Sequence, residues 1–380
     1  MIQTTLPAKL PAVLEIILNS PFFAANYVVN KTCFLIRRIG ESNMSRKRGW
    51  DHNFFKNSRN NLEVIAHRGG LEKYPEETIE AFDHARTLNV GGFRVDVLEL
   101  DVHLTKADEK NPSVLVLMHD EKVDRTTDKT GLLKEFTYNK VFELDAGCRF
   151  TLDGKTFPYS RDKGKHYHVP RLEDVFKEFE NHRMVIEIKQ KNPSIFEALG
   201  NLIINHDSQY KDDLPDRVKL RDRVLVASQY HSELKKFRRR FPDIATSASG
   251  YEMGKFALMS LINPRKVKIN DFDAIQMVAT LDEVKLPFLH IKFLPFKRLF
   301  PFFNKRVVEA AESNELPIHA WTVNREEDME KLIELGVNGI ITDNPERLLK
   351  LLSRLNPPVS SGGANLQKSA AEPKIETEKV

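Results

Sequence analysis

The sequence predicts an α/β fold, a (β/α)8 barrel of the TIM type, and three observations predict it. From residue 62 onward, short apolar segments typical of buried strands alternate with helical stretches. Three of the early segments each end in a polar group, as strands do when their C-terminal ends form the active site of a parallel barrel. The chain has 380 residues, whereas such a barrel needs about 250. The length therefore accommodates one barrel and two flanking segments.

The first flank, residues 1–50, is amphipathic and basic. Apolar residues recur with helical spacing in residues 10–18 and again in residues 22–34, and a basic cluster follows at Arg37, Arg38, Arg46, Lys47 and Arg48. Polar residues interrupt both segments, so neither reaches the roughly 20 apolar residues that span a bilayer, and the start lacks the basic region of a secretory signal. Amphipathic helices beside a cationic cluster predict an anchor at a membrane surface. The alternative is a pair of helices that plug the bottom of the barrel.

The barrel itself is predicted over residues 60–355, with a first helix from about residue 78 to 88 and a largely polar insertion at 121–170. The insertion directly follows a strand end, where loops carry function, so we expect it to wall the substrate pocket. Nine segments fit the strand pattern although the barrel has eight places, and the sequence does not show which one lies outside. The segments are 64–66, 94–104, 113–120, 184–190, 223–230, 244–249, 272–277, 317–323 and 339–342. Residues 360–380 lack apolar periodicity and are predicted to be disordered.

Composition narrows the class of protein. The formal net charge of +4 is too mild to indicate a nucleic-acid partner, and 41% hydrophobic residues suffice for a large core. Cys33 and Cys148 are the two cysteines, too few for a disulfide framework. Reduced thiols favour the cytosolic side of a membrane over a secreted protein.

Two acidic residues of the segment 94–104 share one face of the predicted strand. Side chains alternate along a strand, so Glu99 and Asp101 point the same way, whereas Asp96 has the opposite parity. Glu187 and Lys189 repeat this spacing on another strand. Carboxylates that face one another repel unless a cation lies between them, so Glu99, Asp101 and Glu187 form a candidate metal site. The alternatives are a solvated acidic pair at a strand end and an internal Glu187–Lys189 ion pair.

The donor set predicts the kind of metal. All three ligands offer oxygen, and neither a cysteine nor a zinc-binding His-Glu-x-x-His helix accompanies them. Oxygen donors favour a hard divalent cation, Mg²⁺ or Ca²⁺, over zinc. His103 shares the parity of Glu99 and Asp101, so it is either a further ligand or substrate contact, or an ordinary polar residue at the barrel mouth.

A second constellation follows the first apolar segment. His67, Arg68 and two glycines offer an imidazole, a guanidinium and exposed backbone N–H groups, which together suit an anion. His119 ends the apolar segment 113–120 in the same way.

Six motifs in order resemble the glycerophosphodiester phosphodiesterase family over roughly residues 62–352: His67-Arg68-Gly69-Gly70, Pro75-Glu76-Glu77-Thr78 with Ala81-Phe82, Glu99-Leu100-Asp101 with His119-Asp120, Glu187-Ile188-Lys189, Ala320-Trp321-Thr322-Val323-Asn324 and Gly339-Ile340-Ile341-Thr342-Asp343-Pro345. The resemblance implies a TIM barrel that hydrolyses a phosphodiester with the help of a metal. It further implies metal ligands at Glu99, Asp101 and Glu187, an acid–base pair at His67 and His119, and phosphate contacts at Arg68 and Lys189. The chain departs from the family at Glu77, where an asparagine is usual, and a carboxylate there is unfavourable beside a bound phosphate unless it faces the metal, a basic residue or solvent.

Three classes of function share these motifs. The first is a metal-dependent hydrolase of glycerophosphodiesters or of lysophospholipids, which releases the alcohol headgroup. The second is a phospholipase D-like lyase that leaves a cyclic phosphate, and the third is a non-catalytic barrel that binds phospholipid headgroups. The hydrolase is favoured over the non-catalytic barrel because both histidines and all three carboxylates are present.

Aromatic residues predict two further contacts. Trp321 is expected either to line the substrate pocket or to fill the core. Residues 286–303 interleave phenylalanines with lysine, arginine and three prolines, which argue against a regular element. We expect Phe296, Phe300 and Phe303 to contact the membrane, so that a peripheral or monotopic enzyme takes its lipid substrate from the bilayer surface.

Overall fold

The computed structural model describes residues 49–56, 58–59, 61–159, 164–209, 218–264, 267, 271–279 and 303–356. Most of the predicted N-terminal segment, the predicted disordered tail, Phe296 and Phe300 lie outside the described residues.

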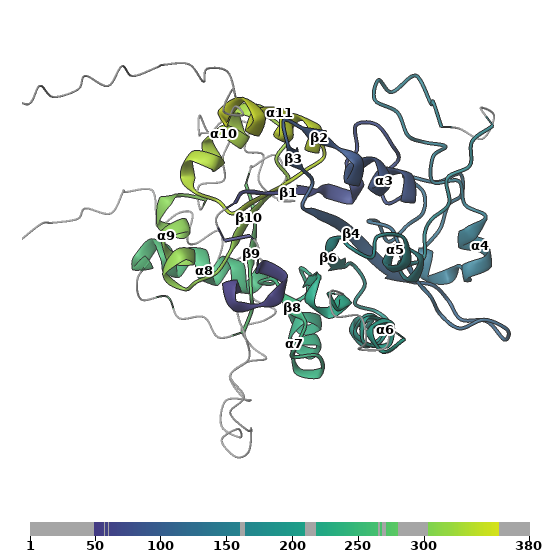
Figure 1. Cartoon of the computed structure of the whole chain (residues 1–380). Helices are drawn as coiled ribbons and strands as arrows, with labels where there is room; N and C mark the ends of the chain where they lie inside the picture. Colours follow the sequence, from purple (N-terminus) through teal and green to yellow (C-terminus); the bar gives the residue numbers. More distant parts are fainter. Residues whose placement is uncertain are drawn as a thin grey trace, which may run out of the picture.

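Eight parallel strands form the predicted barrel (Figure 1). Neighbours are hydrogen-bonded in the order β8-β7-β6-β4-β1-β11-β10-β9, and a bridge between Ser247 and Ala274 joins the two end strands. The amide of Ala248 donates to the carbonyl of Ala274 over 2.8 Å, which reinforces this closure. The strands are β1 (Glu63–Ala66), β4 (Val97–Leu104), β6 (Arg183–Ile188), β7 (Val224–Ala227), β8 (Ala245–Thr246), β9 (Ile275–Val278), β10 (Ile318–Trp321) and β11 (Gly339–Thr342).

The ninth strand candidate is not a barrel strand. Residues 113–120 contain β5 (Leu115–Leu117), which pairs antiparallel with β4. The expectation of three consecutive parallel strands is therefore wrong for this segment. The connection from Leu104 to Leu115 is too short for the crossover helix that two parallel strands require, so the chain turns back as a hairpin.

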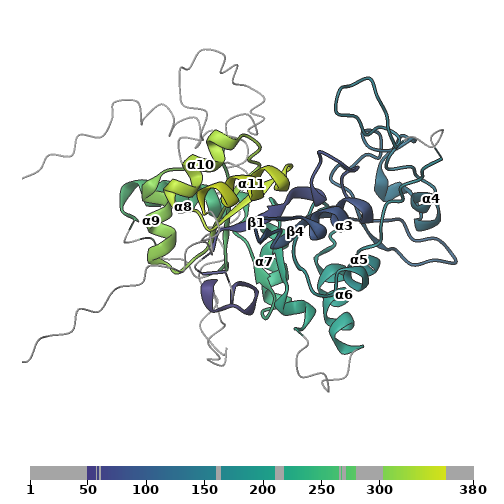
Figure 2. The same cartoon turned by 45° about the horizontal axis from the view of Figure 1, so that its top comes forward.

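Helices surround the strands because the outward-facing side chains of the strands are apolar. Val64, Leu98, Leu100 and Val102 are buried in one large core cluster together with apolar residues of the helices. Figures 1 and 2 show these helices packed around the sheet. They are α3 (Ile79–Thr87), α5 (Leu172–Glu178), α6 (Phe196–Ser208), α7 (His231–Arg240), α8 (Gly250–Ile262), α9 (Lys305–Ser313), α10 (Glu326–Leu335) and α11 (Pro345–Leu355).

The barrel interior is a packed core that closes at the N-terminal strand ends. Inward-facing residues such as Ile65, Val97 and Val185 form a second cluster, and Phe54 and Phe55 belong to it. These two phenylalanines come from the short 3₁₀ helix η2 (Asn53–Phe55), which follows η1 (Gly49–Asp51). The buried Glu63, the first residue of β1, forms ion pairs with Arg183 and His319. The bottom of the barrel is therefore filled by residues that follow the predicted N-terminal helices.

The insertion at 121–170 has a small core of its own, which its largely polar sequence did not predict. Val123, Leu133, Val141 and Leu144 are buried against Val116 and Met118 of the hairpin, away from the main core cluster. The described part of the insertion contains η4 (Leu133–Glu135) and α4 (Tyr138–Phe142). Figure 2 shows it projecting to one side of the barrel, next to the strand β4 that carries two of the candidate ligands, while a separate antiparallel pair is formed by β2 (Asn89–Val90) and β3 (Phe93–Arg94).

Two observations bear on the predicted membrane contact. Among the described helices, none is long and apolar enough to cross a bilayer. Phe303 is only 5% exposed and belongs to the main core cluster just before α9. Its ring therefore packs inside the protein, and the membrane contact predicted for Phe303 is wrong.

Candidate active site

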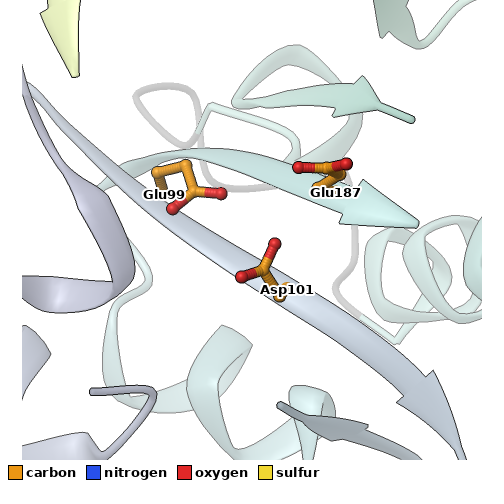
Figure 3. A group of neighbouring side chains, drawn as sticks. All are labelled: Glu99, Asp101 and Glu187. Carbon is orange, nitrogen blue, oxygen red and sulfur yellow. The ribbon is translucent and has the colours of Figure 1, made fainter. Parts of the chain in front are cut away.

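Three carboxylates meet inside the barrel near the C-terminal ends of β4 and β6. The register pairs Asp101 with Glu187, and Glu99 lies one inward-facing position earlier on β4. One oxygen from each residue lies within 4.8 Å of an oxygen of the other two. Figure 3 shows the three side chains gathered on adjacent strands. The parity argument from the sequence therefore predicted which carboxylates come together.

Two cations of the chain face this cluster. Nζ of Lys189 lies 2.8 Å from Oε2 of Glu187 and 3.2 Å from Oδ1 of Asp101. Nε of Arg68 lies 3.1 Å from the other oxygen of Asp101. Although burial alone would raise the pKa of Asp101, the charges of Lys189 and Arg68 lower it to about 2. Burial and the neighbouring Asp101 charge raise the pKa of Glu99 to about 7.

The donor set fits a hard divalent cation. Glu99 and Asp101 are buried, and the oxygens of Asp101 make ion-pair contacts with Lys189 and Arg68 but no hydrogen bond among the described residues. Buried carboxylate oxygens are costly unless a cation or a donor compensates them, and carboxylate oxygens are the ligands that Mg²⁺ and Ca²⁺ prefer. Glu99, Asp101 and Glu187 would hold such an ion, with Lys189 and Arg68 beside it.

His67 lies directly after β1 in a tight turn. The turn is made possible by Gly69, whose φ is +84° and where an added Cβ would lie 2.8 Å from the Cβ of Ala81. Nδ1 of His67 lies 2.5 Å from Oδ1 of Asp343, so it donates to that carboxylate and leaves Nε2 on the side of Glu99, 3.9 Å from its Oε2. Burial would lower the pKa of His67, but the charge of Glu99 and the bond to Asp343 raise it above its ordinary value.

The same turn fixes Arg68. Its backbone N–H donates to Oε2 of Glu99 over 3.0 Å, in a backbone conformation with φ of +52°. Nη1 donates to Oε1 of Glu76, also over 3.0 Å. The guanidinium therefore lies between Asp101 and Glu76, at the edge of the carboxylate cluster.

His119 is held in the same manner by a neighbouring carboxylate. Nδ1 lies 2.6 Å from Oδ1 of Asp120, which leaves Nε2 free for proton transfer. The charges of His119 and His67 both add to the lowering of the Asp101 pKa.

His103 and Trp321 contribute less directly. His103 is buried, its Nε2 lies 3.4 Å from the backbone carbonyl of His119, and it is not a member of the carboxylate group. The alternative of an additional ligand is therefore not supported. The contact of His103 with the backbone of His119 instead helps to hold His119 in place. Trp321 is half-buried at the end of β10 and packs against the barrel-interior cluster.

Glu77 is buried and accepts a backbone hydrogen bond, a partner that the sequence did not predict. Its Oε1 accepts the backbone N–H of Asp101 over 2.9 Å, while Oε2 is buried without a hydrogen-bond partner among the described residues. Burial and the charges of Asp101 and Glu99 raise the pKa of Glu77 well above its ordinary value.

Sequence reasoning assigned no role to several groups that the fold brings to the site. Asp343 orients His67 and accepts the amide of Asn324 over 2.6 Å. Arg125, from the insertion, contacts both Asp120 and Glu76. Asp343 directly follows β11 and Asn324 follows β10, so their positions after strand ends were an available signal. Arg125 had none.

Comparison with known proteins agrees with this geometry. Residues 67–347 match the Glycerophosphoryl diester phosphodiesterase family. A glycerophosphodiester phosphodiesterase of Caldanaerobacter subterraneus subsp. tengcongensis is 30% identical over 292 residues, which cover 77% of this chain and 98% of the bacterial protein. Lysophospholipase D GDPD1 of Rattus norvegicus is 26% identical over 308 residues, covering 77% and 86% of the two chains.

Solved structures share the fold. A phosphodiesterase of Oleispira antarctica, in complex with the product sn-glycerol-3-phosphate, aligns with a TM-score of 0.53 at 19% identity. The alignment covers 77% of this chain and 96% of that one.

Proposed function

The chain belongs to the glycerophosphoryl diester phosphodiesterase family, and from this premise we propose that it hydrolyses glycerophosphodiesters with one divalent cation, Mg²⁺ or Ca²⁺, bound at Glu99, Asp101 and Glu187. It is a phosphoric diester hydrolase by its family. The observation that supports the metal-dependent mechanism is the constellation itself: three converging carboxylates flanked by two histidines whose Nδ1 atoms each lie against a carboxylate.

The side chains divide the work according to their charge. Arg68 offers a fork of donors and Lys189 a point charge to the phosphate of the diester. The cation would polarise the phosphoryl oxygens and neutralise charge on them. Both guanidinium and ammonium now lie against Asp101, so they are already at the position where the phosphate would meet the metal site.

The two histidines transfer protons. One removes the proton from the attacking hydroxyl group, and the other protonates the departing alkoxide. Asp343 and Asp120 hold Nδ1 of His67 and His119 respectively, which fixes the tautomer with Nε2 toward the substrate. Each carboxylate also stabilises the imidazolium that forms during the reaction.

We propose that lysophospholipids are substrates as well as glycerophosphodiesters. The relative from Rattus norvegicus is named a lysophospholipase D, and the Oleispira antarctica structure contains sn-glycerol-3-phosphate as its product. Both substrate types present the same glycerol phosphodiester, and a lysophospholipid adds one acyl chain.

Product analysis with paired substrates tests this function. The enzyme is stripped with a chelator and supplied with Mg²⁺ or Ca²⁺, then given glycerophosphocholine or lysophosphatidylcholine. We expect choline together with glycerol phosphate or lysophosphatidic acid, only after metal is restored. The Glu99→Gln variant, purified in parallel, controls for a contaminating activity. A cyclic phosphate product would identify a lyase instead, and absence of any product from both substrates would contradict the proposal.

We further propose that the enzyme works at a membrane surface, on its cytoplasmic face. The support is the sequence pattern of two segments: residues 1–50 combine amphipathic stretches with a basic cluster, and residues 286–302 interleave aromatic with basic residues.

Sedimentation with liposomes tests the membrane proposal. We expect wild type to pellet with anionic vesicles and much less with zwitterionic ones, because basic residues near the surface contribute about 1 kcal/mol each. A variant with Phe296 and Phe300 changed to serine should pellet less. Phe303 is left unchanged because it is buried. Equal pelleting of both proteins would exclude residues 286–302 as the docking surface, and failure of wild type to pellet with anionic vesicles would exclude the membrane surface altogether.

A further inference from the structure

Arg125 lies in the insertion, yet its guanidinium connects two groups of the candidate active site. Nη1 and Nη2 each lie 2.7 Å from one oxygen of Glu76, in a bidentate pair. Nε donates to Oδ2 of Asp120 over 2.6 Å. One planar side chain therefore donates to two carboxylates at once, in the geometry that only arginine offers.

The first of these carboxylates is shared with Arg68. Glu76 is 9% exposed, and its Oε1 accepts from Nη1 of Arg68 as well as from Arg125. Burial would raise the pKa of Glu76, but the hydrogen bonds of Arg125 and the charge of Arg68 lower it, so the group is an anion. Without Arg125, this anion would face Arg68 alone and would hold that guanidinium more tightly.

The second carboxylate orients His119. Asp120 accepts from Nδ1 of His119 with one oxygen and from Arg125 with the other. The hydrogen bond with His119, and then those of Arg125, keep the pKa of Asp120 well below its ordinary range. Arg125 thus orients the carboxylate of Asp120, which in turn orients the imidazole of His119.

We propose that Arg125 is a positioning residue that acts on the reaction in two separable ways. Through Asp120 it orients His119 for proton transfer, and through Glu76 it competes with Arg68 for that carboxylate, which weakens the Glu76–Arg68 pair and lets Arg68 bind the phosphate of the substrate. The inference rests on the proposed function for the roles of His119 and Arg68. This role would also connect the insertion to the reaction, because Arg125 lies at the start of the insertion, six residues after His119.

The alternative is that Arg125 merely fastens the insertion to the barrel. A fastening role predicts a loss of stability and unchanged kinetic constants for the protein that remains folded. A positioning role predicts that kcat and KM both change and that each change depends on a different carboxylate.

Double-mutant cycles on the full chain separate these roles. We expect Arg125→Ala to lower kcat about tenfold and to raise KM about tenfold, which is within the usual coupling between contacting residues. In the Asp120→Asn background, the same substitution should lower kcat by less than about twofold, because its route to His119 is already lost. Combined with Glu76→Gln, it should return KM to near the wild-type value, because the anion that captures Arg68 is gone. Arg125→Lys should restore little, since an ammonium cannot make the bidentate pair.

Arg171→Ala is the matched control. Arg171 also makes a partly exposed ion pair, with Asp174, at 34% side-chain exposure against 47% for Arg125, and it contacts none of the site residues named above. We expect its kinetic constants to equal those of wild type. Thermal unfolding of every variant shows whether it folds.

Binding of inorganic phosphate, measured by calorimetry in the presence of Mg²⁺ or Ca²⁺, tests the Arg68 route without turnover. Arg125→Ala should weaken phosphate binding and Glu76→Gln should restore it, even if wild type fails to hydrolyse glycerophosphocholine and the proposed function falls. Unchanged phosphate affinity in Arg125→Ala, or effects on kcat and KM that simply add to those of Asp120→Asn and Glu76→Gln, would overturn the positioning role.

Discussion

Glu99→Gln, Asp101→Asn and Glu187→Gln are each expected to lose at least about 10²-fold in turnover, comparable with the removal of one group that stabilises charge in a transition state. Each substitution deletes one charge from the converging carboxylates while keeping the shape of the side chain. Lys189 and Arg68, which now form ion pairs with these carboxylates, would then pair with the carboxylates that remain. Calorimetric titration with Mg²⁺ and with Ca²⁺ should show that metal affinity falls together with activity, while circular dichroism shows a folded chain.

The same titrations should depend on pH in a direction fixed by Glu99. Its pKa is raised to about 7 by burial and by Asp101, so a proton competes with the metal as the pH falls through that value. Metal affinity should therefore be higher at about pH 8 than at about pH 6. In Glu99→Gln this part of the dependence should disappear, because glutamine does not titrate.

Asp96→Asn is the matched control for these variants. Asp96 precedes β4 on the opposite parity, and its Oδ2 accepts the backbone N–H of Val64 over 2.8 Å, an interaction that an asparagine oxygen can keep. Its metal affinity and turnover should equal those of wild type. Full wild-type turnover after exhaustive chelation would contradict the metal assignment for all three carboxylates.

The fold was predictable because strand parity and apolar content are local properties. Alternation alone placed Glu99 and Asp101 inward and Leu100 outward, as the structure has them. The direction of a strand is not local in this sense. Residues 113–120 are as apolar as a parallel strand, and only the length of the connection from Leu104 distinguishes the antiparallel β5.

The groups that orient the site were less predictable than the groups that react. His67 and Asp343 are 276 positions apart, and Arg125 and Glu76 are 49 apart, so these contacts depend on the closed barrel and the folded insertion. The partner of Glu77 was likewise not predictable from the sequence. A carboxylate at this position was expected to be unfavourable beside a phosphate, yet in the folded chain it accepts a hydrogen bond from the backbone N–H of Asp101.

Aromatic residues among basic ones do not by themselves distinguish a membrane contact from core packing. Phe303 ends the segment that predicted membrane docking, but it also precedes α9, whose apolar face includes Val307 and Ala311. The ring is buried with that face in the main core cluster. Tertiary packing of the following helix, which the local pattern did not show, decided its position.

His67→Ala and His119→Ala are each expected to lose about 10² to 10⁴-fold in turnover, the contribution typical of a positioned acid or base. His67 has Asp343 at Nδ1 and His119 has Asp120, so both are built to present Nε2 in one tautomer. The double variant should be little worse than either single variant, because residues that act as a unit are not additive. Turnover of glycerophosphocholine measured across about pH 6 to 8, the range in which imidazole titrates, checks the effect.

His182→Gln is the control for the histidine variants. His182 directly precedes β6 and therefore lies at the opposite end of the barrel from the site, half-buried. The His182→Gln variant should keep wild-type turnover. Metal affinity should be nearly unchanged in His67→Ala and His119→Ala, because the three carboxylates remain. That combination, intact metal binding with lost turnover, separates proton transfer from damage to the metal site. Near-normal turnover of His119→Ala over the whole pH range would show that His119 takes no part in proton transfer. The positioning roles of Asp120 and Arg125, which act on His119, would then fail as well.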